Sequence, residues 1–421
     1  MTAWPRNEKA AAPGKDRGAA SLESKRLPSL AGVRVLDIAT FIAAPFAGTV
    51  LADFGADVIK VEQPGAGDPL RKFGTPTDCG DSLTWLSEAR NKRFITLDLR
   101  TPDGRSLFLK LVEKSDVVME NFRPGTLEKW GLGYDELRAA NPRIVLLRVS
   151  AYGQTGPYRG KPGFARVAHG FSGLSHLAGM EDGPPVVPGS TSLADYISGL
   201  WGATSVMAAL RAAERDGVGQ VVDISLYESV FRLLDELVPV YAKHGEVRQR
   251  HGPSVPHIVP HGHWQAGDGK WVALACSSDK IFERLANVME QPELAERFAT
   301  NQQRIAARAE IEAAIAGWLG RLSMEEAVSR CDAAGVPCGP ILDIADIFKD
   351  PQYAAREDLQ RVQDPRAGEI VVPASVPRLS GTPVQLRHLG GPLGAQTEEV
   401  LGQLLGLDAP AIERLRKMKV V

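Results

Sequence analysis

Short apolar segments typical of buried β-strands alternate with helical segments over the first half of the chain, and this alternation limits the fold more than any other feature. The first unit has a strand at residues 32–39, a helix with Pro45 near its start and Gly55 after its end, and a second strand at residues 57–62. Proline suits the first helical turn and glycine the C-terminal end. Strands alternating with helices build parallel sheets covered on both faces. Because further strand-like runs follow, we expect an α/β protein with a doubly wound, Rossmann-like parallel sheet; these runs are residues 93–99, 116–122, 143–153 and 220–225.

Ligands of such sheets bind where the strands end. We therefore expect the site among the loops that follow Ala39, Glu62, Leu99, Asn121 and Tyr152. The glycine-rich G-x-G-x-x-G turn of nicotinamide enzymes is missing, because TFIAAP stands at that place after the first strand. The sequence therefore argues against a nicotinamide-dependent dehydrogenase.

The chain of 421 residues is too long for one typical hydrophobic core, so two domains are expected. The aperiodic, polar start predicts a flexible tail, and a stretch rich in Pro, Gly, His and charge predicts a linker. We expect a tail at residues 1–29, a large domain at 30–225, a linker at 226–260, a small α/β domain at 261–340 and a return to the large domain at 341–421.

Charge and cysteine content narrow the class of protein. The 49 basic and 51 acidic residues nearly cancel, which is unlike a nucleic-acid-binding chain. No apolar run reaches the length of a membrane span, and the start lacks the apolar core of a secretion signal. The four cysteines have no C-x-x-C spacing and are expected to be reduced thiols. We therefore expect a cytoplasmic protein without nucleic-acid or membrane partners.

Asp195 stands where a Gly/Ser-rich run meets an apolar helix predicted from about Leu193 to Arg215, with Gly217 after its end. If Ser192 is the N-cap, Asp195 lies at the third helical position, where it completes a capping box. Spacing alone favours this capping role. The alternative is that the carboxylate does chemistry.

Several motifs resemble, in order, those of the class III CoA-transferases, the formyl-CoA transferase family. The resemblance covers residues 30–421. It implies an obligate homodimer of two interlocked chains, with Asp195 of GSTSLAD as the nucleophile. The substrates it implies are CoA thioesters and small dicarboxylic acids, and no metal or cofactor is needed. The motifs are GVRVLDIATFIAAPFAGTVLADFGADVIKVE, NKRFITLDLRTPDG, DVVMENFRPGTLEKWGLGYDEL, NPRIVLLRVSAYGQTGPY, DGPPVVPGSTSLADYISG, GQVVDISLYESV and AGVPCGPI.

The same resemblance implies a set of CoA contacts. Gln63 and Lys129 stand where the family's formyl-CoA enzyme has arginines, so the contact of Gln63 is in doubt, whereas the charge of Lys129 is kept. The expected CoA-binding residues are Ile42, Ala43, Leu97, Arg100, Asn121, Phe122 and Lys129.

The expected reaction is transfer. Ala165 replaces the acidic residue that the family's racemases use as a base, which counts against an acyl-CoA racemase. Residues 163–196 most resemble members acting on branched or unsaturated dicarboxylic acids, which implies movement of CoA between the C1 and C4 carboxyls of mesaconyl-CoA. The alternatives are a succinyl-CoA-dependent transferase that works between two molecules and a non-catalytic CoA-binding protein.

A dicarboxylate substrate needs a cation for its free carboxylate. The candidates are Arg166, His169, His257 and His261, with His263 beside them. The three later histidines, spaced H-x-x-x-H-x-H, could also suggest a metal, but no acid or cysteine completes the ligand set nearby, and Pro256 and Pro260 disfavour a helix. A pocket role and an ordinary surface role both stay open, and no metal is expected.

Overall fold

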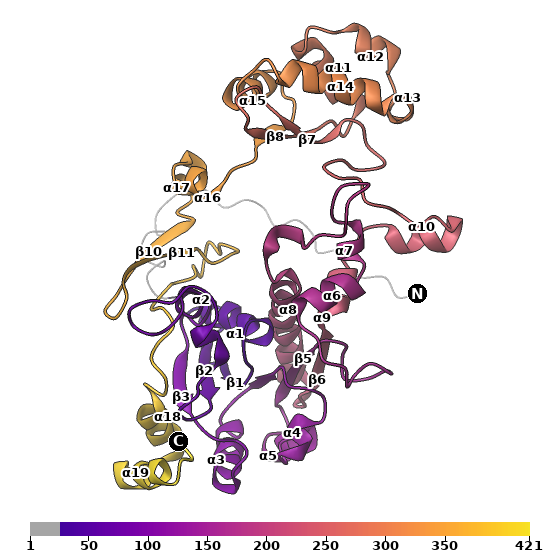
Figure 1. Ribbon diagram of the computed structural model, residues 1–421. Helices are drawn as coiled ribbons and strands as arrows, with labels where there is room; N and C mark the ends of the chain where they lie inside the picture. The colour runs from indigo at the N-terminus through magenta and orange to yellow at the C-terminus, as the bar shows by residue number, and fades with distance from the viewer. Residues whose placement is uncertain (1–25) are drawn as a thin grey trace, which may run out of the picture.

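The computed structural model describes residues 26–421. The predicted tail at residues 1–29 falls almost wholly outside them. Figure 1 shows a sheet-containing unit below, a smaller unit above, and a returning stretch of chain along one side.

Six strands form one sheet, and every neighbouring pair in it is parallel. The strand order is β3-β2-β1-β4-β5-β6, which is the order of a doubly wound fold. The predicted α/β class is therefore confirmed. The strands are β1 Arg34–Asp37, β2 Asp57–Glu62, β3 Arg93–Thr96, β4 Val117–Glu120, β5 Val145–Ser150 and β6 Val221–Ser225.

The central strands are mostly apolar because both faces of the sheet are covered, although Asp37 and Glu120 end β1 and β4 with a charge. Val117 and Met119 of β4 belong to one hydrophobic core, while Val118 between them belongs to the other. Helices α1 and α8 cover the first face, and α3, α5, α18 and α19 pack on the second. The helices of this unit are α1 Ala43–Asp53, α2 Leu83–Glu88, α3 Pro102–Val112, α4 Thr126–Lys129, α5 Tyr134–Ala140, α6 Ala165–Phe171, α7 Leu174–Leu177, α8 Leu193–Asp216, α9 Leu226–Phe231 and α10 Leu237–His244, with 3₁₀ turns η3 Pro69–Lys72 and η4 Pro188–Ser190.

Helices α9 and α10 lie inside the stretch that the sequence predicts as a linker. Leu226 and Val230 of α9 are buried in the core that also contains α1 and α8, so this helix packs as part of the sheet unit. Helix α10 has no buried residue.

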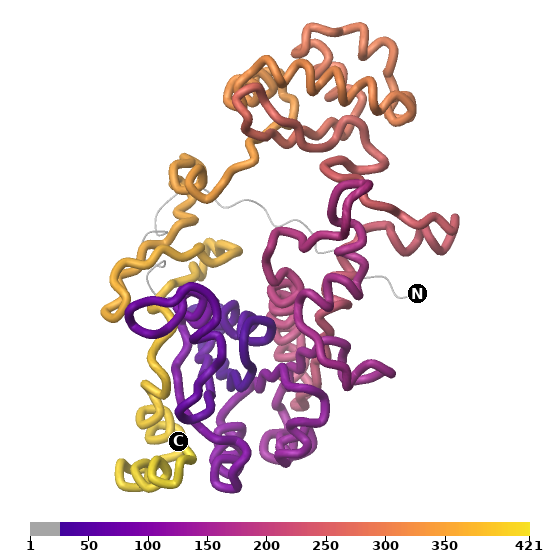
Figure 2. Tube along the Cα trace, viewed as in Figure 1, coloured from indigo at the N-terminus to yellow at the C-terminus, as the bar shows by residue number. Residues whose placement is uncertain are grey.

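The upper unit has a hydrophobic core of its own, formed by residues between Val259 and Val336. Figure 2 shows it joined to the rest of the molecule by two single stretches of chain. The domain boundaries given above stay predictions. The antiparallel sheet of the upper unit contains β7 His261–Gln265, β8 Trp271–Ala275 and β9 Cys338–Pro340. The helices of this unit are α11 Asp279–Val288, α12 Glu293–Arg297, α13 Asn301–Ala306, α14 Arg308–Leu319 and α15 Met324–Ala333.

The chain then returns and covers the outer edge of the large sheet. Gln396 bonds both the N–H and the carbonyl of Phe94, and Thr397 accepts from the N–H of Thr96 at 3.0 Å. The open edge of β3 is thus occupied by side chains and a main-chain bond. The returning elements are α16 Ile344–Ile347, α17 Pro351–Ala355, β10 Leu359–Asp364, β11 Gly368–Pro373, α18 Thr397–Leu405 and α19 Ala409–Lys417.

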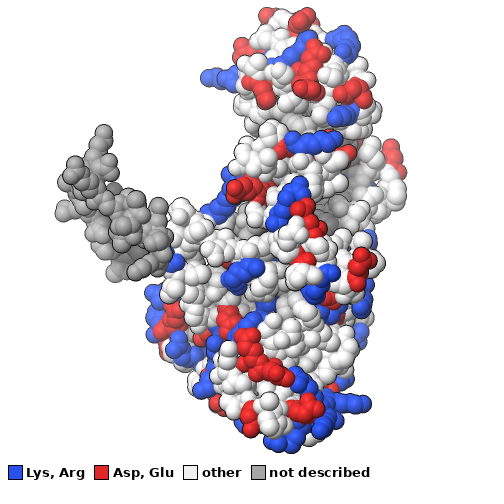
Figure 3. Space-filling view, turned by 90° about the vertical axis from the view of Figure 1, so that its left-hand side faces the viewer, with Lys and Arg blue, Asp and Glu red and all other residues white. Residues whose placement is uncertain are grey.

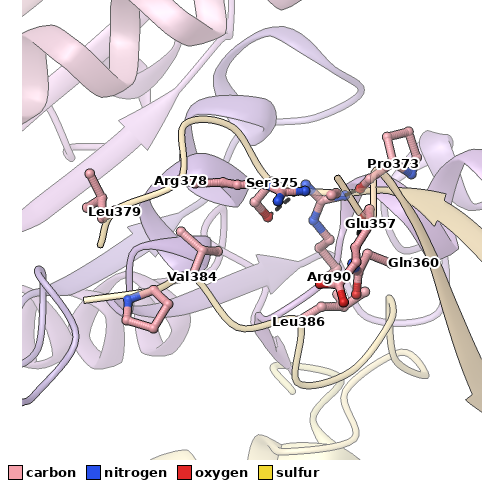
Figure 4. Close-up of a pocket in the computed structure, with 11 residues that line it drawn as sticks. Arg90, Glu357, Gln360, Pro373, Ser375, Arg378, Leu379, Val384 and Leu386 are labelled. Carbon is pink, nitrogen blue, oxygen red and sulfur yellow. Dashed lines mark hydrogen bonds between the residues drawn. The ribbon is translucent and has the colours of Figure 1, made fainter. Parts of the chain in front are cut away.

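A cavity of about 230 Å³ marks the seam between this returning stretch and the sheet unit (Figure 4). Arg90 at its wall is held by Asp53 at 2.8 Å and donates to the carbonyl of Pro373 at 3.1 Å. Arg90 therefore joins the two parts of the chain, and its guanidinium is not free to bind a ligand.

Acidic and basic side chains are interspersed over the face shown in Figure 3. Within residues 26–421, no helix is both long and apolar enough to cross a bilayer.

Candidate active site

The site begins at the point where the strand order reverses, between β1 and β4. The loops that leave these two strands diverge, and Asn121 joins them. Its side-chain oxygen accepts from the N–H of Thr40 at 2.8 Å, and its amide donates to the carbonyl of Thr40 at 2.6 Å. Both polar atoms of Asn121 are therefore used in shaping the loop after β1.

That loop carries a strained residue. Phe41 has φ of 61°, a conformation that is unfavourable for a bulky side chain. Its N–H donates to Asp68 at 3.0 Å, which helps to hold the conformation. Its ring meets the exposed rings of Phe73 and Phe164 edge-on, with centroids 6.0 and 6.1 Å away. We call these three rings the aromatic wall.

Two glycines place α8 directly against α1. A Cβ atom on Gly199 would lie 2.8 Å from the carbonyl oxygen of Ala43, and one on Gly202 would lie 3.2 Å from the Cβ of Ala47. The two helices therefore run in the same direction in close contact. Because Asp195 precedes Gly199 by one turn, it stands just beyond the start of α1.

Asp195 is a partly buried carboxylate with no ion pair and no side-chain hydrogen bond to residues 26–421. Burial raises its pKa to about 7. The next residue, Tyr196, packs edge-on against Phe46 of α1 at 4.9 Å. The site thus holds a desolvated acid whose charge nothing in the described chain compensates.

The predicted capping box at the start of α8 is wrong. Helix α8 does begin at Leu193 after Ser192, but the Ser192 side chain makes no capping bond. The N–H of Ala194 instead donates to Nε2 of His169 at 3.0 Å. His169, predicted as a ligand of the substrate carboxylate, is 1% exposed.

A second cavity, of about 330 Å³, lies outside the ends of β1, β2 and β3, within the size range of small-molecule sites. Residues 40–43 connect it to the start of α1, where Asp195 stands. Of the residues predicted to bind CoA, Leu97, Arg100 and Phe122 line this cavity. So do Gln63 and Trp130, of which Trp130 was not expected.

A buried group of charges that the sequence did not predict lies beneath the loop. Asp37 lies 3.5 Å from the Lys60 ammonium and 3.0 Å from that of Lys92, and all three side chains are buried. Lys60 also pairs with Asp68 at 2.8 Å, the acid that holds Phe41. The only signals in the sequence were Asp37 at the end of an apolar run and Lys60 between apolar neighbours in the next strand.

The remaining predicted residues are spread over the molecule. Ile42 and Ala43 are buried at the start of α1, and Lys129 is exposed at the end of α4. Arg166 is exposed near the start of α6 and forms no salt bridge within residues 26–421.

Strand β7, which carries His261, belongs to the upper unit and lies away from the start of α8 (Figure 1), and His257 precedes this strand in the chain. His257 lies 3.3 Å from Glu236, and His261 is on β7 with His263. A single chain therefore does not bring these histidines together with Asp195. Among the described residues, no three or more His, Cys, Asp or Glu side chains are grouped to hold a metal.

The fold and the site define a doubly wound α/β protein with a ligand-sized cavity beside a desolvated carboxylate. Residues 30–397 match CoA-transferase family III, and the chain belongs to this family. It is therefore a CoA-transferase, as the resemblance implied.

Three relatives give a finer comparison. The chain is 52% identical over 396 residues to the beta subunit of succinyl-CoA–L-malate CoA-transferase from Chloroflexus aurantiacus, covering 93% of this chain and 98% of that one. It is 50% identical over 400 residues to the alpha subunit from the same organism, covering 94% and 93%. A succinyl-CoA–D-citramalate CoA-transferase of C. aurantiacus is 43% identical, covering 95% and 100%.

Among solved structures, a CAIB/BAIF family protein from Brucella suis superimposes with a TM-score of 0.79 at 32% identity. The match covers 90% of this chain and 100% of that one. The fold is therefore shared over almost the whole length.

Proposed function

We propose that this protein transfers CoA from succinyl-CoA to a small dicarboxylic acid of the malate type, through covalent intermediates on Asp195. The observation that carries the proposal is the isolated, desolvated carboxylate at the start of α8, next to the cavity at the strand ends. The relatives, which are named for succinyl-CoA, malate and citramalate, favour transfer between two molecules over the intramolecular mesaconyl-CoA reaction.

Asp195 would act in two rounds. Its carboxylate attacks the thioester carbonyl of succinyl-CoA, the C–S bond breaks, and a mixed anhydride and CoA thiolate form. The thiolate then attacks the Asp195 carbonyl of the anhydride, which gives an aspartyl-CoA thioester and releases succinate. The acceptor carboxylate attacks that thioester and the same steps run in reverse, which restores Asp195. Covalent catalysis divides one difficult exchange into easier steps, and protons balance without an external acid or base.

The start of α1 can stabilise the oxyanions of these steps. Its N-cap residue, Ile42, supplies no side-chain cap, so the N–H groups of Ala43 and Ala44 stay available as donors, while Pro45 has no N–H. They lie beside the turn that carries Asp195, because Gly199 brings the two helices together. Main-chain donors aimed at developing negative charge are a large term in acyl transfer.

The acid would bind between the aromatic wall and the start of α6. Phe164 precedes α6, and Arg166 lies in its first turn with no salt bridge within residues 26–421. The rings suit a short carbon skeleton, and the guanidinium suits the free carboxylate. Leu97 and Arg100 would contact the nucleotide part of CoA, and Phe122 its pantetheine, in the cavity of about 330 Å³.

The working form is proposed to be a homodimer. Leu200 and Trp201 of α8 are 49% and 40% exposed, and Val238 and Tyr241 of α10 are 51% and 60% exposed. An exposed apolar surface of this kind favours association. Because the chain is about equally similar to both subunits of the malate enzyme, the test is whether this chain alone forms an active dimer, with its mass measured at nanomolar concentration. An active monomer would contradict the proposal.

The reaction is tested with purified protein, succinyl-CoA, and L-malate, citramalate or mesaconate labelled with ¹³C, with products followed by mass. We expect labelled acyl-CoA and free succinate in equal amounts. Asp195→Ala should abolish both, whereas Asp182→Asn, at an exposed carboxylate, should change neither. A second incubation supplies unlabelled mesaconyl-C1-CoA with an excess of labelled free mesaconate. If unlabelled mesaconyl-C4-CoA then forms at a rate that the free acid does not change, the reaction is intramolecular.

Trapping identifies the nucleophile. Hydroxylamine added during turnover should modify one peptide, the one that contains Asp195. Modification of another carboxylate, or full activity of Asp195→Ala, would rule out the assignment.

A further inference from the structure

The helix that carries Asp195 is capped by a side chain from another helix. Ser192 provides no cap, and the N–H of Asp195 turns back to the carbonyl of Ser192 at 2.9 Å. The N–H of Ala194, one residue before the nucleophile, donates to Nε2 of His169 at 3.0 Å. His169 belongs to α6 and is 1% exposed.

This contact defines the protonation state of the ring. A nitrogen that accepts a hydrogen bond carries no proton, so the single proton of neutral His169 is on Nδ1. Nδ1 is itself buried and has no partner within residues 26–421. An imidazolium could not accept from Ala194 and would place a cation at the positive end of the helix dipole. Burial, assisted by Arg166, lowers the pKa of His169, in agreement with a neutral ring.

The same geometry argues against contact with substrate. Nε2 is occupied by Ala194, and Nδ1 is closed off from solvent. His169 therefore cannot serve the free carboxylate as the sequence analysis expected, whereas Arg166, on the same helix, is exposed.

We propose that His169 is a positioning residue for Asp195: its neutral imidazole holds the N–H of Ala194 and so fixes the turn that presents the nucleophile, without placing a positive charge beside it. This inference rests on the proposed function of Asp195. Helix α6 then has two tasks, since Phe164 at its start belongs to the aromatic wall and His169 in its last turn holds the start of α8.

Two substitutions separate this role from a merely structural one. His169→Gln keeps a neutral acceptor, because the amide oxygen can take the bond from Ala194, while His169→Leu keeps similar bulk and removes the acceptor. We expect kcat of the Gln variant to stay within about threefold of wild type. We expect kcat of the Leu variant to fall about 100-fold, the size of effect that misplacing a reacting group has, with the KM for succinyl-CoA changed less than twofold. The rate at which hydroxylamine traps Asp195 should fall in parallel.

The control is His176→Leu, at an exposed histidine on α7, which should leave kcat unchanged. A folded Leu variant with wild-type kcat would overturn the proposal. A folded Gln variant as slow as the Leu variant would also overturn it, because the imidazole would then do something an amide acceptor cannot.

The protonation of the His169 ring can be measured by NMR without turnover, so the proposal can be tested even if the variants do not fold. This measurement also separates the proposal from the proposed function of Asp195. In wild-type protein labelled with ¹⁵N-histidine, the His169 ring should show a proton on Nδ1 and none on Nε2 at pH 7. Its signal can be assigned after the other histidines have been substituted singly. A ring protonated on Nε2 would contradict the proposal, even if Asp195 proves to be the nucleophile.

Discussion

Replacing Asp195 with asparagine should make the protein more stable, by an amount that depends on pH. Burial raises the pKa of Asp195 from 3.8 to about 7. In the unfolded chain the carboxyl ionises near its ordinary pKa, so between about pH 4 and pH 7 the folded state binds more protons than the unfolded state. The wild-type protein therefore loses stability as the pH rises through this range. An asparagine side chain does not titrate and avoids the loss.

The size of the gain follows from the two pKa values. Each pKa unit corresponds to about 1.4 kcal/mol, so the folded state bears a penalty of about 2 kcal/mol at pH 5 and about 4 kcal/mol at pH 8, where the titration is complete. For a large domain, 1 kcal/mol corresponds to about 2 °C in Tm. The Tm of the Asn variant should exceed that of wild type by about 4 °C at pH 5 and about 8 °C at pH 8.

The assay is the thermal midpoint of wild type and freshly prepared Asp195→Asn at pH 5, 6, 7 and 8, since deamidation would slowly restore the acid. Asp182→Asn, at an exposed site, should show no pH-dependent gain. If the Asp195→Asn gain is the same at every pH, or if the variant is less stable at pH 8, the carboxylate is not desolvated and the reasoning fails. The same pKa predicts that kcat/KM of wild type rises with pH and levels off above about pH 7, because the attacking carboxylate must be ionised.

Three further predictions concern the surroundings of the site. Gly199→Ala should fold but lower kcat at least tenfold in steady-state assays, because its Cβ would lie 2.8 Å from the carbonyl oxygen of Ala43 and push the Asp195 turn away; unchanged kcat would contradict the close packing. Arg100→Glu should raise the KM for succinyl-CoA several-fold and leave kcat within twofold, and a KM that does not move would remove Arg100 from the CoA site. Lys92→Met should destabilise the fold by about 2 kcal/mol, because it removes the 3.0 Å bond to buried Asp37 while Lys60 stays 3.5 Å from that carboxylate; a Tm within 1 °C of wild type would show that Asp37 has no need of Lys92.

Local patterns predicted the elements well where burial on both faces left a continuous apolar run. Strand β2 occupies the predicted residues 57–62, and α8 ends where Gly217 was expected to follow, with φ of 73° at that glycine. These features depend on residues close together in the chain.

The failures all depend on distant partners. The spacing of Ser192 and Asp195 gave no sign that His169, far earlier in the chain, would take the capping position. The resemblance predicted CoA contacts at Leu97, Arg100 and Phe122, and these residues do line one cavity. It could not indicate that both polar atoms of the Asn121 side chain would form hydrogen bonds with the main chain of Thr40. His261 was grouped with Asp195 by the chemistry of its side chain alone, and no local pattern could show that β7 belongs to the upper unit, away from the start of α8.

The edge of β3 is covered by residues that are synthesised much later than the strand itself, and this affects how the chain folds during synthesis. The groups that bond Phe94 and Thr96 come from Gln396 and Thr397, which leave the ribosome about 300 residues later, or about 15–60 s at ordinary elongation rates. During that interval the nascent sheet presents an unpaired edge while the upper unit is being synthesised. A chain interrupted in that interval would keep the edge open and be prone to aggregation, so we expect the growing polypeptide to depend on chaperones until residues 396–397 have emerged.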